Sequence, residues 1–349
     1  MCVWSAYAGK KNAAPVVFDA LRKIEGFWAG HYTGIATCCD GKIHFSKCAG
    51  STDFFATQFS LDDLPGNMAL AHSRTASGGF DNRAHPFVGT EGIVALVSQG
   101  SAGVYADTRH LYTEVLNELY NEGRRPRSGG PATHNMRTIP GLTTPDGNQV
   151  SAADVETNEI ERRYMIHGDI TKALREAALR LPGEHCSICL FADRPGVIGF
   201  INMNQRVCYA FEEDGVYLAT AMPALPNGTG MEIPGNSVGY VTADGVFHRE
   251  VLNKELPLKT AIPAGLEKAA LEYLKANPGS PIAHICDKAL RPLFTPGELD
   301  CHAIAVYRTI ENLCKAGLIN YEVAGRINGS TNRPARPFLW SVTETSALS

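Results

Sequence analysis

A cysteine stands directly after the initiator methionine, and a strand-forming run, VWSAYA, follows it. If the methionine is removed, Cys2 becomes the first residue, and its free α-amine can act as the base for its own thiol. The fold would then be organised around its own first residues. A single free cysteine is more often a small buried hydrophobic residue, so the rest of the sequence must decide.

Three later segments carry polar side chains between apolar runs. RTASGG occupies residues 74–79, AHP occupies residues 84–86, and an apolar run from Glu91 ends in Ser98-Gln99-Gly100. The stretch from 75 to 87 is rich in Gly, Asn and Pro, which predicts a loop. Loops of this kind commonly carry ligand-binding residues.

Together with Cys2, these segments resemble the glutaminase domain of class II glutamine amidotransferases, which are N-terminal nucleophile hydrolases typified by glucosamine-6-phosphate synthase. That family opens MCGIVGY and later shows RWATHG, NAHPH and a strand ending in HNG. The counterparts here are MCVWSAY, RTASGG, AHP and VSQG, in the same order. The resemblance covers residues 2 to about 250.

The resemblance implies a cofactor-free and metal-free hydrolysis of glutamine or a related amide. Cys2 would attack the side-chain amide, ammonia would leave a γ-glutamyl thioester, and water would release glutamate. The oxyanion needs fixed donors, which the family supplies from an Asn side chain and the next glycine amide. Those positions are Gln99 and Gly100 here, so the expected catalytic residues are Cys2, Gln99 and Gly100.

Substrate binding is likewise carried over from the resemblance. Arg74 would bind the α-carboxylate through a bidentate contact, Ser77 stands where the family has Thr, and His85 matches the family's AHP histidine. The family's Asp-Thr-Glu motif, whose Asp binds the α-amino group, falls at Thr157. Taken singly, Arg74 would be a surface ion pair and His85 a satisfied loop histidine, and their order with Cys2 favours the site.

Several positions depart from the family. Val3 replaces Gly, Thr75 replaces Trp, Gly78 replaces the loop His, and Thr157 stands at the Asp position. Two hypotheses therefore stand: an amide hydrolase, and a catalytically degenerate ligand sensor or transcription regulator.

Charge and composition argue against a membrane-spanning protein and against a global attraction to nucleic acid. The 349 residues predict two domains, and 32 basic against 36 acidic side chains give a charge of −4, which creates no global attraction to nucleic acid or membrane. No apolar run approaches the ~20 residues that span a bilayer, so we expect a cytoplasmic protein. The Cys186-Cys189 pair has CxxC spacing, but in a strand these side chains point to opposite faces, so we expect neither metal nor redox use.

The hydropathy pattern predicts a mixed α+β fold with mostly antiparallel strands. Expected helices span 13–25, 109–122, 157–167 and 170–180, and expected strands span 33–39, 42–48, 68–74, 91–98, 185–192, 197–201, 206–211, 216–221 and 237–247. The resemblance implies that they form a four-layer αββα sandwich over residues 2–250. Residues 123–150, rich in Arg, Gly and Pro, form an insertion relative to the family.

The last hundred residues predict a second unit. A linker at 251–262 precedes helices at 264–276, 281–290 and 299–316 and strands at 319–324 and 337–342. Residues 263–349 thus resemble a winged-helix domain, with Arg326, Arg333 and Arg336 on the wing. Such a unit binds DNA or serves as a protein-docking or dimerisation module. Nothing after residue 250 resembles an ammonia-consuming module, so a separate partner enzyme is expected to accept the ammonia.

Overall fold

Two antiparallel sheets lie face to face in the computed structural model, which describes residues 2–75, 80–102, 108–130, 142–253, 262–294, 302–329 and 331–343. The seven-stranded sheet has the order β13-β11-β12-β1-β4-β2-β3, and the six-stranded sheet has the order β15-β14-β10-β9-β6-β5. The first sheet contains β1 (Val3–Gly9), β2 (Tyr32–Cys39), β3 (Lys42–Ala49), β4 (Met68–Arg74), β11 (Cys208–Glu212), β12 (Gly215–Ala219) and β13 (Met231–Glu232). The second contains β5 (Phe87–Val88), β6 (Val94–Ala102), β9 (Gly183–Phe191), β10 (Val197–Asn202), β14 (Ser237–Thr242) and β15 (Phe247–Val251).

Alternating side chains divide each strand between two cores. On β1, Trp4, Ala6 and Ala8 lie between the sheets, whereas Val3 and Tyr7 face the helices on the outer side. This is the two-residue period of a strand that is buried on both faces. The sheets therefore have a shared inner core and a separate outer core on each side.

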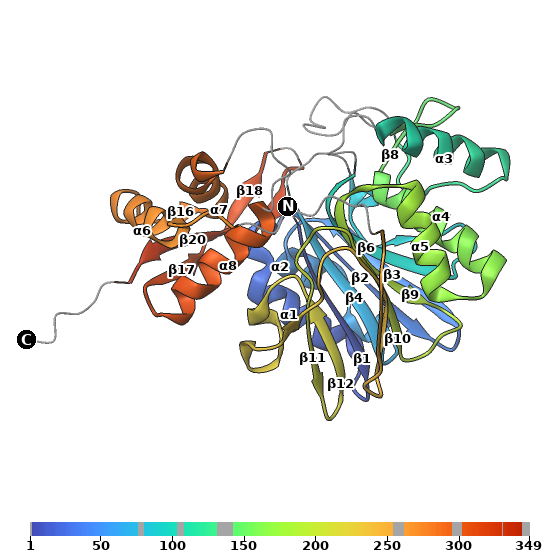
Figure 1. Ribbon diagram of the computed structural model, residues 1–349, viewed down its shortest axis with the longest axis horizontal. Coiled ribbons are helices and arrows are strands. Elements are labelled where there is room, and N and C mark those ends of the chain that lie inside the picture. Colours follow the sequence, from blue (N-terminus) through green and yellow to red (C-terminus); the bar gives the residue numbers. More distant parts are fainter. Residues whose placement is uncertain are drawn as a thin grey trace, which may run out of the picture.

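Helices cover both outer faces, which gives four layers (Figure 1). Helix α1 (Ala13–Ile24) covers the first sheet with α2 (Thr52–Gln58) beside it, and α4 (Ala152–His167) and α5 (Ile170–Arg180) cover the second. Helix α3 (Arg109–Asn121) packs beside α4, and the short strands β7 (Leu142–Thr143) and β8 (Gln149–Val150) pair within the insertion. The described part of the chain contains no helix long and apolar enough to cross a bilayer.

The C-terminal elements pack against the first sheet and its helix. They are α6 (Leu266–Ala276), β16 (Ser280–Pro281), α7 (Ile282–Ile285) with a π-helical turn at Cys286–Leu290, α8 (His302–Lys315), β17 (Ile319–Val323), β18 (Arg326–Asn328), β19 (Arg333–Ala335) and β20 (Phe338–Val342). Strands β16, β20 and β17 form one sheet, and β18 pairs with β19. Tyr307 and Trp340 belong to the same apolar core as Val3 and Tyr7. Figure 1 shows these elements, orange to red, beside the amino-terminal end of the chain.

Most expected elements are confirmed, and two need correction. The strand expected at 237–247 is two strands, because the Thr242 amide donates to the Val246 carbonyl oxygen across a turn and β14 pairs with β15. Helix α4 begins at Ala152 instead of residue 157. Cys186 lies in the core between the sheets and Cys189 lies under the helices, which confirms that the CxxC side chains point to opposite faces.

Candidate active site

Cys2 and Arg74 lie at the same end of two neighbouring central strands. Strand β1 pairs with β4 in an antiparallel register that ends with Val3 opposite Ser73, and Cys2 and Arg74 are the next residues of the two segments. Cys2 is partly exposed, although the strand that follows it is buried. The sequence order therefore translates into proximity: the thiol and the guanidinium share one edge of the first sheet.

The Arg74 side chain is held by a carbonyl and an aromatic ring. Its Nη1 donates to the Arg83 carbonyl oxygen at 3.0 Å, and its guanidinium carbon lies 5.2 Å from the centre of the Tyr32 ring. Burial lowers the pKa of Arg74 and the nearby Cys2 thiol opposes that shift, yet arginine stays protonated in proteins. A fixed positive charge thus stands beside Cys2.

The His85 ring stacks on the ring of His72, a residue of β4. His72 Nε2 donates to the Ser98 carbonyl oxygen at 3.0 Å, and the Ser98 amide donates to His85 Nδ1 at 3.2 Å. Burial lowers the pKa of His72 to about 3 and lowers the pKa of His85 well below its usual value. Both rings are therefore neutral at physiological pH, and they join β4 to β6.

Gln99 is fully buried between the two sheets. Its Oε1 accepts a hydrogen bond from Thr220 Oγ1 at 3.0 Å, and Thr220 Oγ1 in turn accepts from the Trp4 amide at 3.0 Å. Its Nε2 donates to Gln205 Oε1 at 3.4 Å. Gln99 is thus connected to the residue two positions after Cys2.

Gly100, the next residue, has a backbone that only glycine fits. Its φ is +114°, and an added Cβ would stand 2.1 Å from the Glu184 carbonyl oxygen. The β6 backbone therefore passes β9 at a distance that any side chain would prevent.

Two expected substrate-binding residues are placed differently. Ser77 lies outside the described residues. The Thr157 hydroxyl donates to the Ala153 carbonyl one turn earlier in α4, so it is satisfied within its own helix. The side chain before it, Glu156, reaches the strands instead.

Glu156 is a buried carboxylate that the sequence analysis did not single out. Its Oε1 accepts from Ser187 Oγ at 2.7 Å and lies 2.9 Å from His185 Nε2, and Ser187 in turn contacts the Ser98 hydroxyl at 3.2 Å. Through the Ser187 hydroxyl, this buried carboxylate is linked to the hydroxyl of Ser98, the strand residue that precedes Gln99. The missed signal is Thr157 itself, because placing it on the central Thr of the Asp-Thr-Glu motif puts Glu156 at the acidic position.

Lys47 anchors the loop that carries Arg83 and His85. Its ammonium group donates to the carbonyl oxygens of Asn82, Ala84 and Pro86 at 3.4, 2.8 and 3.0 Å. Burial lowers the pKa of Lys47 to about 8. One amine therefore bonds three carbonyl oxygens of the loop whose Arg83 carbonyl holds Arg74.

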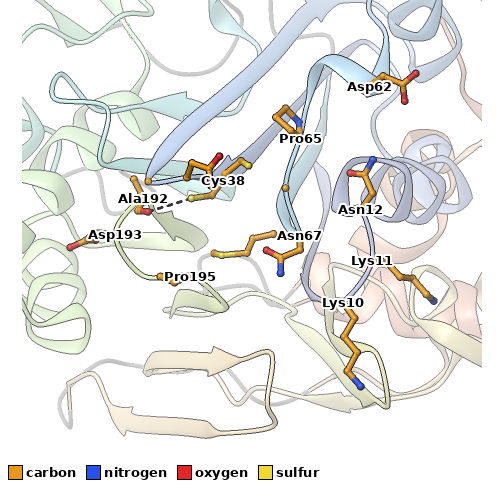
Figure 2. A pocket seen from close by; sticks show the side chains of 15 residues that line it. Lys10, Lys11, Asn12, Cys38, Asp62, Pro65, Asn67, Ala192, Asp193 and Pro195 are labelled. Atoms are coloured by element: carbon orange, nitrogen blue, oxygen red, sulfur yellow. Dashed lines mark hydrogen bonds between the residues drawn. The ribbon is translucent and has the colours of Figure 1, made fainter.

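A separate cavity of about 860 Å³ lies at the opposite end of the strands (Figure 2). Lys10 lines it, and at ~3.3 Å per strand residue Lys10 stands roughly 25 Å from Cys2. In Figure 2 Cys38 contacts the Ala192 carbonyl oxygen at 3.5 Å, which joins the two sheets at this end. Burial raises the pKa of Cys38, which disfavours a thiolate there. This cavity is not part of the Cys2 site.

The described residues contain no group of three or more His, Cys, Asp or Glu side chains that could hold a metal ion. The Cys2 edge presents a thiol, a guanidinium, a buried side-chain amide and a glycine backbone amide.

Solved structures that share this fold are glutamine amidotransferases, a class of hydrolase and transferase enzymes. Glutamine phosphoribosylpyrophosphate amidotransferase from B. subtilis superposes with a TM-score of 0.55 and 15% identity, over 89% of this chain and 64% of that chain. The structure described as the allosteric regulatory enzyme of purine biosynthesis gives a TM-score of 0.54 and 16% identity, over 88% of this chain and 63% of that one. These likenesses establish the fold.

Sequence relatives point to the same class. The chain is 27% identical over 228 residues to glutamine–fructose-6-phosphate aminotransferase (isomerizing) of Pyrococcus horikoshii, covering 64% of this chain and 33% of the relative. It is 29% identical over 238 residues to the enzyme of that name from Methanothermobacter thermautotrophicus, covering 67% and 35%. The chain thus spans about a third of the length of these relatives. No family model matches it.

Proposed function

We propose that this chain is a class II glutamine amidotransferase-type hydrolase that uses Cys2 as its nucleophile. The observation that carries the proposal is that Cys2 and Arg74 lie next to the last pair of two adjacent central strands, within a fold shared with glutamine amidotransferases. The names of the sequence relatives support glutamine as the amide substrate.

In this proposal removal of Met1 frees the α-amine of Cys2, which takes the thiol proton as the thiol attacks the amide carbon. The same amine then donates the proton to the departing ammonia, leaving a γ-glutamyl thioester on Cys2. Water activated by the amine adds to the thioester, and glutamate leaves as the thiol regains its proton. These steps use only the Cys2 thiol, its α-amine and water.

The other residues bind and polarise. Arg74 pairs with the α-carboxylate, because its guanidinium is charged and held by Arg83 and Tyr32. The Gly100 amide and the Gln99 side chain stabilise the oxyanion. Ser77 and His85 stay predicted substrate-binding residues. For binding the α-ammonium group we propose Glu156 in place of Thr157, because the Glu156 carboxylate reaches Ser187 beside β6.

Labelling of the full chain tests this proposal. A glutamine analogue carrying a diazoketone should modify the N-terminal peptide, which should lack Met1, and excess glutamine should protect it. Arg74→Gln should slow the labelling, whereas Arg326→Gln, an exposed control, should not. Retention of Met1, or labelling spread evenly over Cys2 and the partly exposed Cys39 and Cys314, would contradict the proposal.

For residues 263–349 we propose a winged-helix-like module that follows a glutaminase domain at 2–250 and a linker at 251–262. The order α6, β16, α7, α8, β17, then the β18–β19 hairpin and β20, supports this assignment. The ammonia acceptor is a separate partner enzyme in this proposal.

The arrangement of α8 favours the enzyme over a DNA-binding regulator. Tyr307 is fully buried, and Glu311 accepts a 2.7 Å hydrogen bond from Arg206 of the sandwich. On the wing, Arg336 Nη1 donates to the Arg22 carbonyl oxygen at 2.9 Å. A recognition helix whose side chains are engaged in this way cannot place them in a major groove. This supports a docking role for the module within the chain. A homodimer stays a prediction, which sedimentation would test.

A further inference from the structure

The C-terminal module contacts the proposed nucleophile directly. The Tyr307 hydroxyl donates a 3.0 Å hydrogen bond to the backbone carbonyl oxygen of Cys2, across 305 positions of sequence. The Tyr307 ring is fully buried on α8 and lies 6.0 Å from the Phe27 ring, centre to centre. The hydroxyl is therefore held by a rigid, packed side chain.

This hydrogen bond lies just beyond the reach of the sheet ladder. The β1–β4 pairing begins at Val3, and both the amide and the carbonyl of Trp4 are bonded to Thr220. Because the peptide group is planar, the oxygen and the Cα of Cys2 move together when the chain rotates at Val3. Fixing that oxygen fixes the Cα from which both the thiol and the α-amine project.

Ion pairs hold α8 in the position that this contact requires. The buried Arg206 side chain donates to Glu311 Oε2 at 2.7 Å and to Glu232 Oε1 at 3.1 Å. Arg308 pairs with Glu232 at 2.5 Å, and Glu311 Oε1 accepts from the Met222 amide at 3.1 Å. Arg308 directly after Tyr307, and Glu311 one turn after it, thus tie α8 to the sandwich.

The module also reaches the neighbourhood of Arg74. The Arg336 amide donates to the Gly30 carbonyl oxygen at 3.2 Å, and the Gly30 amide donates to Ser73 Oγ at 2.8 Å. The module therefore contacts Cys2 itself and, through Gly30, reaches the side chain of the residue before Arg74.

We propose that Tyr307 is a positioning residue for Cys2, so that the C-terminal module completes the active site instead of acting at a distance from it. The inference rests on the proposed function. It predicts that kcat for glutamine hydrolysis at Cys2 depends on the Tyr307 hydroxyl, whereas glutamine binding does not depend on it.

The test compares the full-length protein with Tyr307→Phe and with Tyr321→Phe, which removes an exposed hydroxyl from the same module. Tyr307→Phe should lower kcat for glutamine hydrolysis about tenfold or more, because small misplacement of a nucleophile costs rate, and should leave KM unchanged. Tyr321→Phe should match the parent. Equal kcat values for Tyr307→Phe and the parent would overturn the inference.

A second readout separates this inference from the proposed function. The rate at which iodoacetamide alkylates the Cys2 peptide, followed against pH, should change in Tyr307→Phe because the amine and the thiol lose their fixed position beside the Arg74 guanidinium. If the parent hydrolyses no glutamine, the proposed function fails, and this pH profile still decides the inference: identical profiles refute it. If Tyr307→Phe does not fold, Glu311→Gln, which loosens α8 and keeps the hydroxyl, should show the same loss of kcat at constant KM, and an unchanged kcat would count against the inference.

Discussion

The imidazole rings of His72 and His85 are stacked, with centroids 4.1 Å apart and planes inclined by 19°. Both rings bond the backbone of Ser98, one through its carbonyl and the other through its amide. Strand β4, the loop at 80–86 and strand β6 therefore meet at two neutral rings that would repel each other if protonated.

This stack predicts acid sensitivity. The pKa of His72 is about 3 in the folded chain and near 6.5 when unfolded, so below pH 6.5 the unfolded chain binds a proton that the folded chain does not. The stability due to a neutral His72 is present above pH 6.5 and is lost as the pH falls toward 3, by up to ~1.4 kcal/mol per pH unit. His72→Gln should therefore lose less stability between pH 6.5 and 4.5, measured by urea unfolding.

His284→Gln, at an exposed position of α7, is the control and should follow the parent. Glu25, whose pKa burial raises to about 7, acts with the opposite sign, because its stability is present below 4.5 and is lost as the pH rises toward 7. The comparison is therefore the difference between each variant and the parent. A His72→Gln slope equal to that of the parent would show that the ring is protonated in the folded chain.

Lys47→Met should weaken the loop behind Arg74. Three carbonyl oxygens lose their donor, and a buried unsatisfied group costs ~1–3 kcal/mol. We expect a fall of several degrees in Tm together with a raised KM for glutamine, because Arg74 is held by the Arg83 carbonyl of the same loop. Lys42→Met, at the exposed start of the same strand, should change neither value, and a loop variant with normal KM would mean that the loop does not position Arg74.

Gly100→Ala should be strongly destabilising. Its φ of +114° disfavours a side chain, and the new Cβ would meet the Glu184 carbonyl at 2.1 Å; overpacking alone costs ~1–3 kcal/mol. Gly92→Ala has a positive φ of +77° but nothing within 4 Å of the added Cβ, so it isolates the backbone strain. Thermal unfolding should rank Gly100→Ala well below Gly92→Ala, and equal Tm values would show that β6 can move away from β9.

The sequence was most informative where side-chain periodicity was simple. Helix α5 spans Ile170–Arg180 as expected, since its apolar residues repeat with a helical period. The start of α4 was missed because Asp154, Glu156 and Glu159 are buried polar residues, which hide the apolar face that marks a helix. Asp244-Gly245 is a hairpin-turn signal, and it lies inside the single strand expected at 237–247.

The site could be predicted only in part, because local sequence patterns do not specify which distant segments contact each other. Motif order selected Cys2 and Arg74, and the β1–β4 pairing, which ends at Val3 and Ser73, brings the two residues to the same end of the sheet. The insertion before α4 obscured the alignment at Glu156. The contact of Tyr307 with Cys2 depends on how α8 docks on the sandwich, which helical periodicity cannot indicate.

Glutamine turnover by the full chain decides whether the Cys2 thiol is the nucleophile. The parent and a Cys39→Ala control, which removes another partly exposed thiol, should release ammonia and glutamate in equal amounts, and Cys2→Ala should release neither while still binding glutamine. Binding of glutamine with no ammonia release by the parent, or ammonia release that persists in Cys2→Ala, would contradict the account.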